Sequence, residues 1–279
     1  MNRSNIYLII RKEVKDSFQN RWFIIFTIAF SILSFLLSYV GTRNIGYSEI
    51  SGFGRTTASL INLVLMLIPL MGLMLGCISI SGEREKGTLH YLLSHPISKR
   101  EIFAGKFGGL FFSLIFTITI GFALGGIAIF FKSGSSDISK YLLDLLITII
   151  LASSVISIGM LISACTRKIS KSIGIAIFVW FFLIILSDLG IIGSVILFNL
   201  GIEPTFYLTM LNPTEVYKIL SVLVLSSRFE ILGPVGIYIS DTMGRSGALL
   251  VLTLVLLLWT LIPFVISYQY FCRLKKEEI

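Results

Sequence analysis

Six long apolar stretches divide this sequence, and each is long enough to cross a lipid bilayer as a helix. A spanning helix needs about 20 predominantly apolar residues, so six spans with short connections account for most of the 279 residues. Charged residues make up 14% of the chain, about half the share of a typical soluble domain. We therefore predict an all-α integral membrane protein with a single transmembrane domain over residues 1–279. The predicted spans are Trp22–Gly41, Ala58–Ser81, Ile102–Phe131, Tyr141–Cys165, Ile173–Leu197 and Ser246–Cys272.

The positions of the basic residues orient these spans. Sixteen of the 23 Lys and Arg residues lie before the first span, after the last or in the even-numbered connections, and seven lie on the opposite side. Because basic residues concentrate on the cytoplasmic side, we expect a multi-pass protein of the inner (plasma) membrane with both termini in the cytoplasm. The net charge of +8 then faces anionic lipid head groups, and no nucleic-acid partner is needed to explain it. The composition also disfavours a soluble enzyme and a secreted disulfide scaffold.

Residues 5–20 precede the first span and form a separate amphipathic element. Ile6, Ile10, Val14 and Phe18 recur every four residues, while the charged residues fall elsewhere. This spacing predicts an interfacial helix on the cytoplasmic membrane surface. A cytosolic helix beside the membrane is the alternative.

Residues 201–245 form the long connection between the fifth and sixth spans, and the charge pattern places it outside the cell membrane. It contains Val216–Leu225, an apolar run that is too short to span. Turn signals flank this run, Asn212-Pro213 before it and Gly233-Pro234 after it. We predict short re-entrant or interfacial segments in this extracytoplasmic region.

Residues 83–100 connect the second and third spans and carry the most distinctive pattern. The charged run Glu83–Lys86 precedes apolar residues spaced as on one face of a short helix, and Ser98-x-x-Glu101 predicts a capping box that opens the third span. Such a helix suits docking into a groove on a soluble partner, or else it fixes two spans at the membrane surface. Its apolar residues are Leu89, Leu92, Leu93 and Pro96.

The stretch from Glu83 to Lys106 resembles the signature of ABC-2-type permeases, the membrane subunits of ATP-binding-cassette exporters. The matching residues read E-R-E-x-G-T-L and then L-L-S-x-P-I-S-K-R-E-I-F-x-G-K. The resemblance implies a homodimer in membrane lipid whose coupling region contacts an ABC ATPase dimer on the cytoplasmic side, with Thr166–Ser172 as a smaller second contact. The residues implied in ATPase coupling are Glu83, Arg84, Glu85, Gly87, Thr88, Leu89, Leu92, Pro96, Arg100, Thr166, Arg167 and Lys168. Glu83 and Glu85 are expected as charged docking contacts, and Leu89 and Leu92 as apolar anchors.

The sequence has no phosphate-binding loop. Gly105-Lys106 is followed by Phe107 and lacks the upstream glycine of the motif G-x-x-x-x-G-K-[ST]. We therefore expect a transporter subunit rather than an enzyme, with no cofactor and no catalytic residue in this chain, and with ATP and Mg held by the partner ATPase. An intramembrane enzyme would need a nucleophile with its base, or metal ligands, at membrane depth, and no H-E-x-x-H motif occurs.

A closer resemblance concerns the outer segment. Leu211-Asn-Pro-Thr-Glu-Val-Tyr-Lys218, followed by Leu232-Gly-Pro-x-Gly236, is similar to permeases of the NosY type, which belong to the transporter that matures nitrous-oxide reductase. It implies a periplasmic β-helical partner and a role in assembling the copper–sulfur centre of that enzyme by export of a sulfur species. The alternatives are a generic ABC-2 exporter of drug, lipid or ion, and a mechanotransmission subunit without solute flux. The implied outer-partner contacts are Asn212, Pro213, Tyr217, Gly233 and Pro234.

Asp188 lies within the fifth predicted span, where an ionised carboxylate is costly. It marks a helix break near the outer leaflet, contacts the transport pathway, or is exposed at the lipid interface. Two Gly-x-x-x-Gly pairs, at Gly72/Gly76 and Gly121/Gly125, predict close helix packing within the chain or, as the alternative, at the dimer interface.

The three cysteines fall near the cytoplasmic ends of even-numbered spans. Cys77, Cys165 and Cys272 are well separated in the sequence. We interpret them as small apolar residues, with a thiol site for a soft metal as the alternative, and we predict no metal site.

Overall fold

Every element in the described part of the chain is helical, which confirms the predicted all-α architecture. The computed structural model describes residues 3–41, 51–94, 96–133, 138–187, 189–190, 193, 197, 201–225, 232 and 234–273. The elements are α1 (Arg3–Gln19), α2 (Arg21–Gly41), α3 (Ser51–Glu85), α4 (Thr88–Ser94), α5 (Lys99–Ser133), α6 (Ile138–Cys165), α7 (Ile169–Phe181), the π-helical segment η1 (Phe182–Leu186), α9 (Ile202–Met210), α10 (Pro213–Leu225), α11 (Pro234–Thr242) and α12 (Gly244–Arg273).

Six stretches among the described helices are long and apolar enough to cross a membrane. They overlap all six predicted spans, and each begins within four residues of its predicted start. Among the described residues the fifth stretch ends at Leu186, and most of the chain from there to its predicted end at Leu197 lies outside the described residues. The six stretches are Arg21–Val40, Ala58–Glu85, Lys99–Ala128, Ile138–Cys165, Ile169–Leu186 and Gly244–Arg273.

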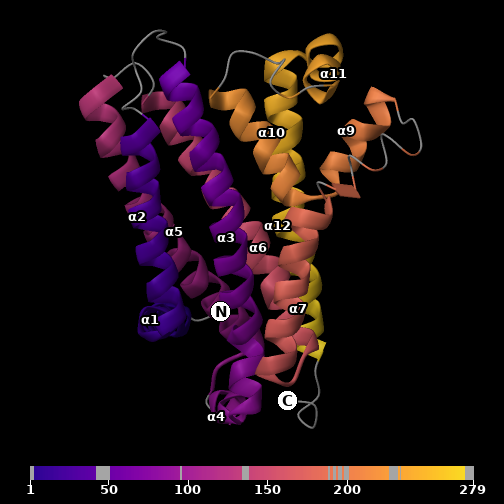
Figure 1. Cartoon of the computed structure of the whole chain (residues 1–279). Coiled ribbons are helices and arrows are strands. Elements are labelled where there is room, and N and C mark those ends of the chain that lie inside the picture. The colour runs from indigo at the N-terminus through magenta and orange to yellow at the C-terminus, as the bar shows by residue number, and fades with distance from the viewer. Residues whose placement is uncertain are drawn as a thin grey trace.

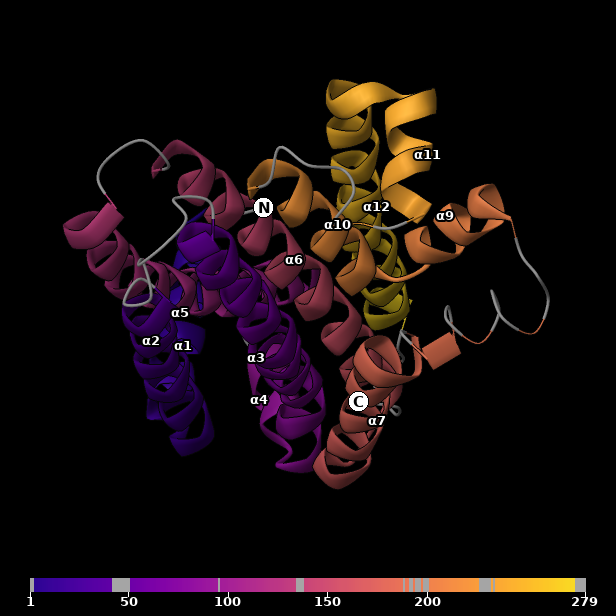
Figure 2. The same ribbon diagram turned by 45° about the horizontal axis from the view of Figure 1, so that its top comes forward.

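The long helices run side by side, with α3 and α6 in the middle (Figure 1). The C-terminal end of α12 and the short helix α4 lie at one end of the bundle, and α9 and α11 lie at the other. Figure 1 shows α1 almost end-on, so this helix crosses the direction of the spans. In the turned view, α2 and α5 stay on one side of α3 and α6, while α11 and α12 stay on the other (Figure 2).

The central pair, α3 and α6, packs backbone against backbone. A Cβ placed on Gly76 would lie 2.9 Å from the Cα of Gly159, and a Cβ on Gly159 would lie 2.9 Å from the carbonyl oxygen of Leu73. In the other predicted pair, a Cβ on Gly121 would overlap the ring of Phe30 in α2. Both Gly-x-x-x-Gly pairs therefore serve packing within the chain, as predicted, because small residues let helices approach closely.

The first helix lies directly on α5. A Cβ on Gly105 would come within 2.7 Å of the Ile9 side chain, so α1 contacts the backbone of α5. The buried line of α1 is Ile9, Glu13 and Ser17. The predicted face Ile6, Ile10, Val14 and Phe18 is only half-buried. The neighbouring residues Ile9 and Glu13 pack against the glycines of α5 instead.

The outer region contains a bent helix pair. α9 and α10 meet at 112°, and α10 is almost entirely buried against α6 and α12. A bend of this size is found in a broken span or in a re-entrant loop, so the re-entrant or interfacial character of Val216–Leu225 stays a prediction.

Candidate functional site

The predicted coupling region folds as a tight corner between α3 and α4. The amide of Lys86 donates to Gly82 O at 3.2 Å and that of Gly87 donates to Arg84 O at 3.2 Å, which ends α3. Gly87 has a φ of +68°, a conformation that glycine adopts without a steric penalty. The chain therefore reverses within two residues and enters α4 at Thr88.

Part of the apolar face of α4 packs against other helices of this chain. Leu89 is fully buried, and Leu92 and Leu93 are half-buried against the core. Tyr91 points the other way and is 69% exposed. Leu89 is therefore an anchor that holds α4 to its own bundle, while Tyr91 is the prominent side chain on the outer surface of α4.

The capping box predicted at the start of the third span is confirmed. The amide of Glu101 donates to Ser98 Oγ at 3.3 Å, and the amide of Ser98 donates to Glu101 Oε2 at 3.2 Å. These reciprocal bonds satisfy free amides at the start of α5. They also fix the path by which the chain returns from α4 to the bundle.

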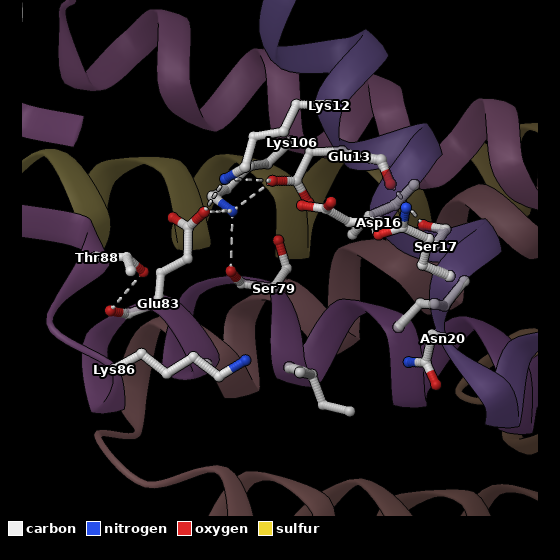
Figure 3. A pocket seen from close by; sticks show the side chains of 15 residues that line it. Lys12, Glu13, Asp16, Ser17, Asn20, Ser79, Glu83, Lys86, Thr88 and Lys106 are labelled. Carbon is white, nitrogen blue, oxygen red and sulfur yellow. Dashed lines mark hydrogen bonds and ion pairs between the residues drawn. The ribbon is translucent and has the colours of Figure 1, made fainter. Parts of the chain in front are cut away.

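A buried cluster of charged residues lies beside this corner and joins three helices (Figure 3). Lys106 of α5 is 1% exposed, and its Nζ bonds Glu13 Oε1 of α1 at 2.8 Å and Ser79 O of α3 at 3.0 Å. The same Nζ lies 2.9 Å from Glu83 Oε1 of α3. Lys12 of α1 also donates to Glu83 Oε1, at 2.8 Å. We call Lys12, Glu13, Glu83 and Lys106 the charged junction.

The charged junction is balanced in formal charge, with two lysines and two glutamates. An ammonium group has three N–H donors, and Lys106 directs its donors to three acceptors on α1 and α3. Removing one partner of a buried ion pair leaves an uncompensated charge and typically costs about 3–5 kcal/mol. The junction therefore links α1, α3 and α5 to one another at this end of the bundle.

The sequence analysis missed this cluster, although one signal was available. Lys106 lies inside the predicted span Ile102–Phe131, and an ionisable residue within a span marks a functional site by default. Its partners Glu13 and Glu83 are 93 and 23 positions away in the sequence. No local spacing rule connects residues so far apart.

A second set of bonds ties the corner to the connection between α6 and α7. Arg84 Nη1 donates to Ala164 O at 3.2 Å and to Thr166 O at 3.0 Å. Glu85 Oε2 accepts a hydrogen bond from the amide of Ile169, at the start of α7. The two connections implied in ATPase coupling are therefore held together, with Arg84 and Glu85 as the links.

The structure divides the residues implied in coupling into an inner and an outer set. Glu83 and Arg84 are half-buried and bonded within the chain, as described above. The buried members are Leu89 and Thr166, and the exposed members are Glu85, Gly87, Thr88, Pro96, Arg100, Arg167 and Lys168. Leu92 is half-buried.

The outer residues Asn212 and Thr214 join α10 to the π-helical segment. The amide of Thr214 donates to Asn212 Oδ1 at 2.9 Å, which caps the start of α10. Asn212 Nδ2 and Thr214 Oγ1 both donate to Leu183 O, at 2.6 and 3.0 Å. Asn212 and Pro213 are buried, so the structure uses them inside the chain. Gly233, the Pro234 side chain and Asp188 lie outside the described residues.

Tyr217 belongs to a buried polar contact that the sequence analysis also missed. Its hydroxyl lies 3.2 Å from Thr148 Oγ1 and donates to Asp144 Oδ1 at 3.5 Å. Asp144 and Tyr217 are both buried, on α6 and α10. Asp144 lies within the predicted span Tyr141–Cys165, so the same rule for ionisable residues in spans would have indicated it.

The cysteines lie in three different environments. Cys77 is buried, Cys165 is exposed and Cys272 is intermediate. Over the residues that the structure describes, no group of three or more His, Cys, Asp and Glu side chains gathers as a set of metal ligands.

Comparison with known proteins identifies the family. Residues 7–278 match the model of the ABC-2 family transporter proteins. The chain is 29% identical over 286 residues to the "Probable ABC transporter permease protein NosY" of Stutzerimonas stutzeri, covering 97% of this chain and 99% of that protein. It is 29% identical over 223 residues to the protein of the same name from Pseudomonas aeruginosa, covering 77% and 81%. With six apolar helices and a family match over nearly its whole length, this chain belongs to the ABC-2 family of transporter proteins and is a multi-pass membrane permease similar to NosY.

Proposed function

We propose that this permease couples ATP hydrolysis by a partner ATPase to export, and that the corner of α3, α4 and α5 receives the force. The end of the bundle that holds α4 is then cytoplasmic, in agreement with the distribution of basic residues. The permease works as a homodimer in the inner membrane, and the ATPase dimer carries ATP and Mg. The charged junction is the observation that supports this proposal most strongly.

The junction provides the mechanical connection that coupling requires. α4 is anchored by Leu89, and the helix before it bonds α1 and α5 through Glu83 and Lys106. Arg84 and Glu85 extend the connection to α6 and α7. A displacement of α4 would therefore reach five helices at once. An ATPase drives such a change only if it binds one arrangement of these helices better than the other.

The exposed surface of the corner is the proposed docking face. Tyr91 and Arg100 present an aromatic ring and a guanidinium group, the residue types that dominate binding interfaces. Glu83 and Glu85, expected from the sequence to be docking contacts, already bond within the chain. We therefore assign them to transmission and assign ATPase contact to Tyr91, Thr88 and Arg100.

The proposed cargo follows from the resemblance to the NosY permeases. We infer that the transporter exports a sulfur species for the copper–sulfur centre of nitrous-oxide reductase, together with a periplasmic β-helical partner. The similarity extends over 97% of this chain in one relative, including the outer segment around Asn212 and Tyr217. The outer partner would bind at the end of the bundle that holds α9 and α11.

Co-purification in mild detergent tests the docking face. Wild type is expected to retain an ABC ATPase, and Tyr91→Ala is expected to lose most of it because the exposed ring supplies the central contact. Tyr7→Ala is the matched control, since Tyr7 on α1 is 64% exposed against 69% for Tyr91. Failure of folded wild type to retain an ATPase, or equal loss in both variants, would contradict the proposal.

A second experiment tests the cargo. A host that lacks its own permease is complemented with this chain, and the copper-site absorption of its nitrous-oxide reductase is measured. The proposal predicts recovery of the absorption, together with ATP-dependent movement of labelled sulfur into sealed inverted vesicles. Recovery without sulfur flux would favour mechanotransmission, and no recovery with flux of another solute would favour a generic exporter.

A further inference from the structure

A polar cavity of about 550 Å³ adjoins the charged junction, bounded by α1, α3 and α5 (Figure 3). Its charged lining residues are Lys12, Glu13, Asp16, Glu83, Lys86 and Lys106, three basic and three acidic. The cavity therefore carries no net formal charge, yet it presents both signs. Such a lining suits a ligand that is itself zwitterionic.

Two buried polar atoms on the cavity wall have no hydrogen-bond partner among the described residues. They are Glu83 Oε2 and Ser79 Oγ. Ser79 is 8% exposed, and both residues line the cavity around Lys106. Buried polar groups in native proteins are almost always bonded. Because a carboxylate oxygen only accepts hydrogen bonds, the missing partner at Glu83 is a donor.

An apolar pocket adjoins this cavity. A smaller pocket of about 70 Å³ shares Asn20, Leu75 and Ile78 with it. The smaller pocket lies among residues of α2, α3 and α7, and its remaining lining is Trp22, Phe23, Phe26, Met71, Met74 and Ile173. A polar chamber followed by a narrow apolar one matches a head group followed by the first methylenes of an acyl chain.

The location of the cavity fits the surface of a bilayer. α1 crosses the direction of the spans and exposes Tyr7 and Leu8, which is the arrangement of a helix lying at the head-group level (Figure 1). The apolar pocket lies beside the spanning helices α2 and α3. A membrane lipid would therefore reach this site laterally, with its head group beside α1.

We propose that this cavity binds the head group of a zwitterionic phospholipid that carries a primary ammonium. The ammonium donates to Glu83 Oε2 and Ser79 Oγ, and the phosphate faces Lys86, which lies on the cavity wall (Figure 3). The bound lipid completes the hydrogen bonding of the α3 wall of the junction. A quaternary ammonium would fill the same space but has no N–H to donate.

The test uses the purified full-length protein, first delipidated and then given defined lipids in detergent micelles. Retention is measured by native mass spectrometry with phosphatidylethanolamine, phosphatidylcholine and phosphatidylglycerol of identical acyl chains, and with free phosphoethanolamine. The variants are Lys86→Gln at the cavity rim and Ser79→Ala on its wall. Lys15→Gln, an exposed residue of α1 that does not line the cavity, is the control.

The proposal predicts that wild type retains phosphatidylethanolamine about tenfold more tightly than either other lipid. Lys86→Gln should lower that retention roughly tenfold and Ser79→Ala by a smaller factor, since one hydrogen bond to a charged group is lost in each case. Lys15→Gln should match wild type. Equal retention of the three lipids, no effect of either variant, or equally tight binding of free phosphoethanolamine would overturn the proposal. None of these lipid-retention results depends on whether an ATPase binds.

Discussion

Lys106 shows how one buried cation organises the end of a helix bundle. Its three acceptors come from two other helices, and it is 1% exposed. Lys12 bonds the same carboxylate of Glu83, but its side chain is 45% exposed. Because solvent screens exposed ion pairs and not buried ones, these two lysines should differ strongly in their contribution to stability.

Replacement of Lys106 by Met should lower the free energy of unfolding by about 3–5 kcal/mol, because buried Glu13 loses its close cation and keeps only Lys12, whose Nζ lies 4.0 Å away. Replacement of Lys12 by Met should cost less than about 1 kcal/mol. Thermal unfolding in detergent, followed by circular dichroism, measures both. Equal destabilisation by the two substitutions would show that Lys106 is not the organising charge.

At the scale of elements, the packing of α3 on α6 depends on the absence of side chains at Gly76 and Gly159. A methyl group at Gly76 would meet backbone atoms, which do not rotate away. Gly174 in α7 has nothing within 4 Å of its position for a Cβ. Alanine substitution at Gly76 and at Gly174 therefore adds the same methyl group, in a packed environment at Gly76 and in an open one at Gly174.

Gly76→Ala should destabilise the protein by about 1–3 kcal/mol through overpacking. Gly174→Ala should be neutral or stabilising by about 0.5–1 kcal/mol, because alanine loses less chain entropy in a helix. Comparing their unfolding temperatures at equal lipid and detergent content decides the matter. A stable Gly76→Ala variant would mean that α3 and α6 are not in backbone contact.

The buried outer helix α10 provides a second prediction at this scale. Asn212→Ala removes both the cap of α10 and a bond to Leu183 O, and should cost about 1–2 kcal/mol. Asn212→Ser keeps an oxygen that can cap α10 and loses the amide donor, so its cost should be smaller. Limited proteolysis of the outer segment should rank the two variants in that order, and the reverse order would contradict the assigned bonds.

Element-scale features were the ones that the sequence could predict. Apolar length located the six spans, Ser98 and Glu101 predicted the cap of α5, and the short run Val216–Leu225 indicated a separate short segment, which is part of α10. Pairings between distant elements were not predictable. The spacing in α1 revealed an apolar face, but only the glycines of α5 explain why Ile9 and Glu13 are the residues that it buries.

At the scale of the whole molecule, the junction and the Arg84 and Glu85 bonds make one end of the bundle a connected unit. α4 is attached to that unit, while the buried contact between Asp144 and Tyr217 joins α6 to α10 further along the bundle. We expect force applied at α4 to reach the spans through the junction. Binding of the ATPase and transmission of its work are therefore separable properties of this chain.

One measurement tests that claim most directly: ATP-dependent output compared with ATPase binding in Glu83→Gln. The substitution keeps the shape of Glu83 and removes its charge from the junction. We predict that ATPase co-purification stays near the wild-type level while the output, measured as nitrous-oxide reductase maturation, falls roughly tenfold, which corresponds to a loss of about 1.4 kcal/mol. Lys15→Gln, which changes an exposed charge of α1 outside the junction and the cavity, should leave both unchanged. Wild-type output from Glu83→Gln with bound ATPase would contradict transmission through the junction.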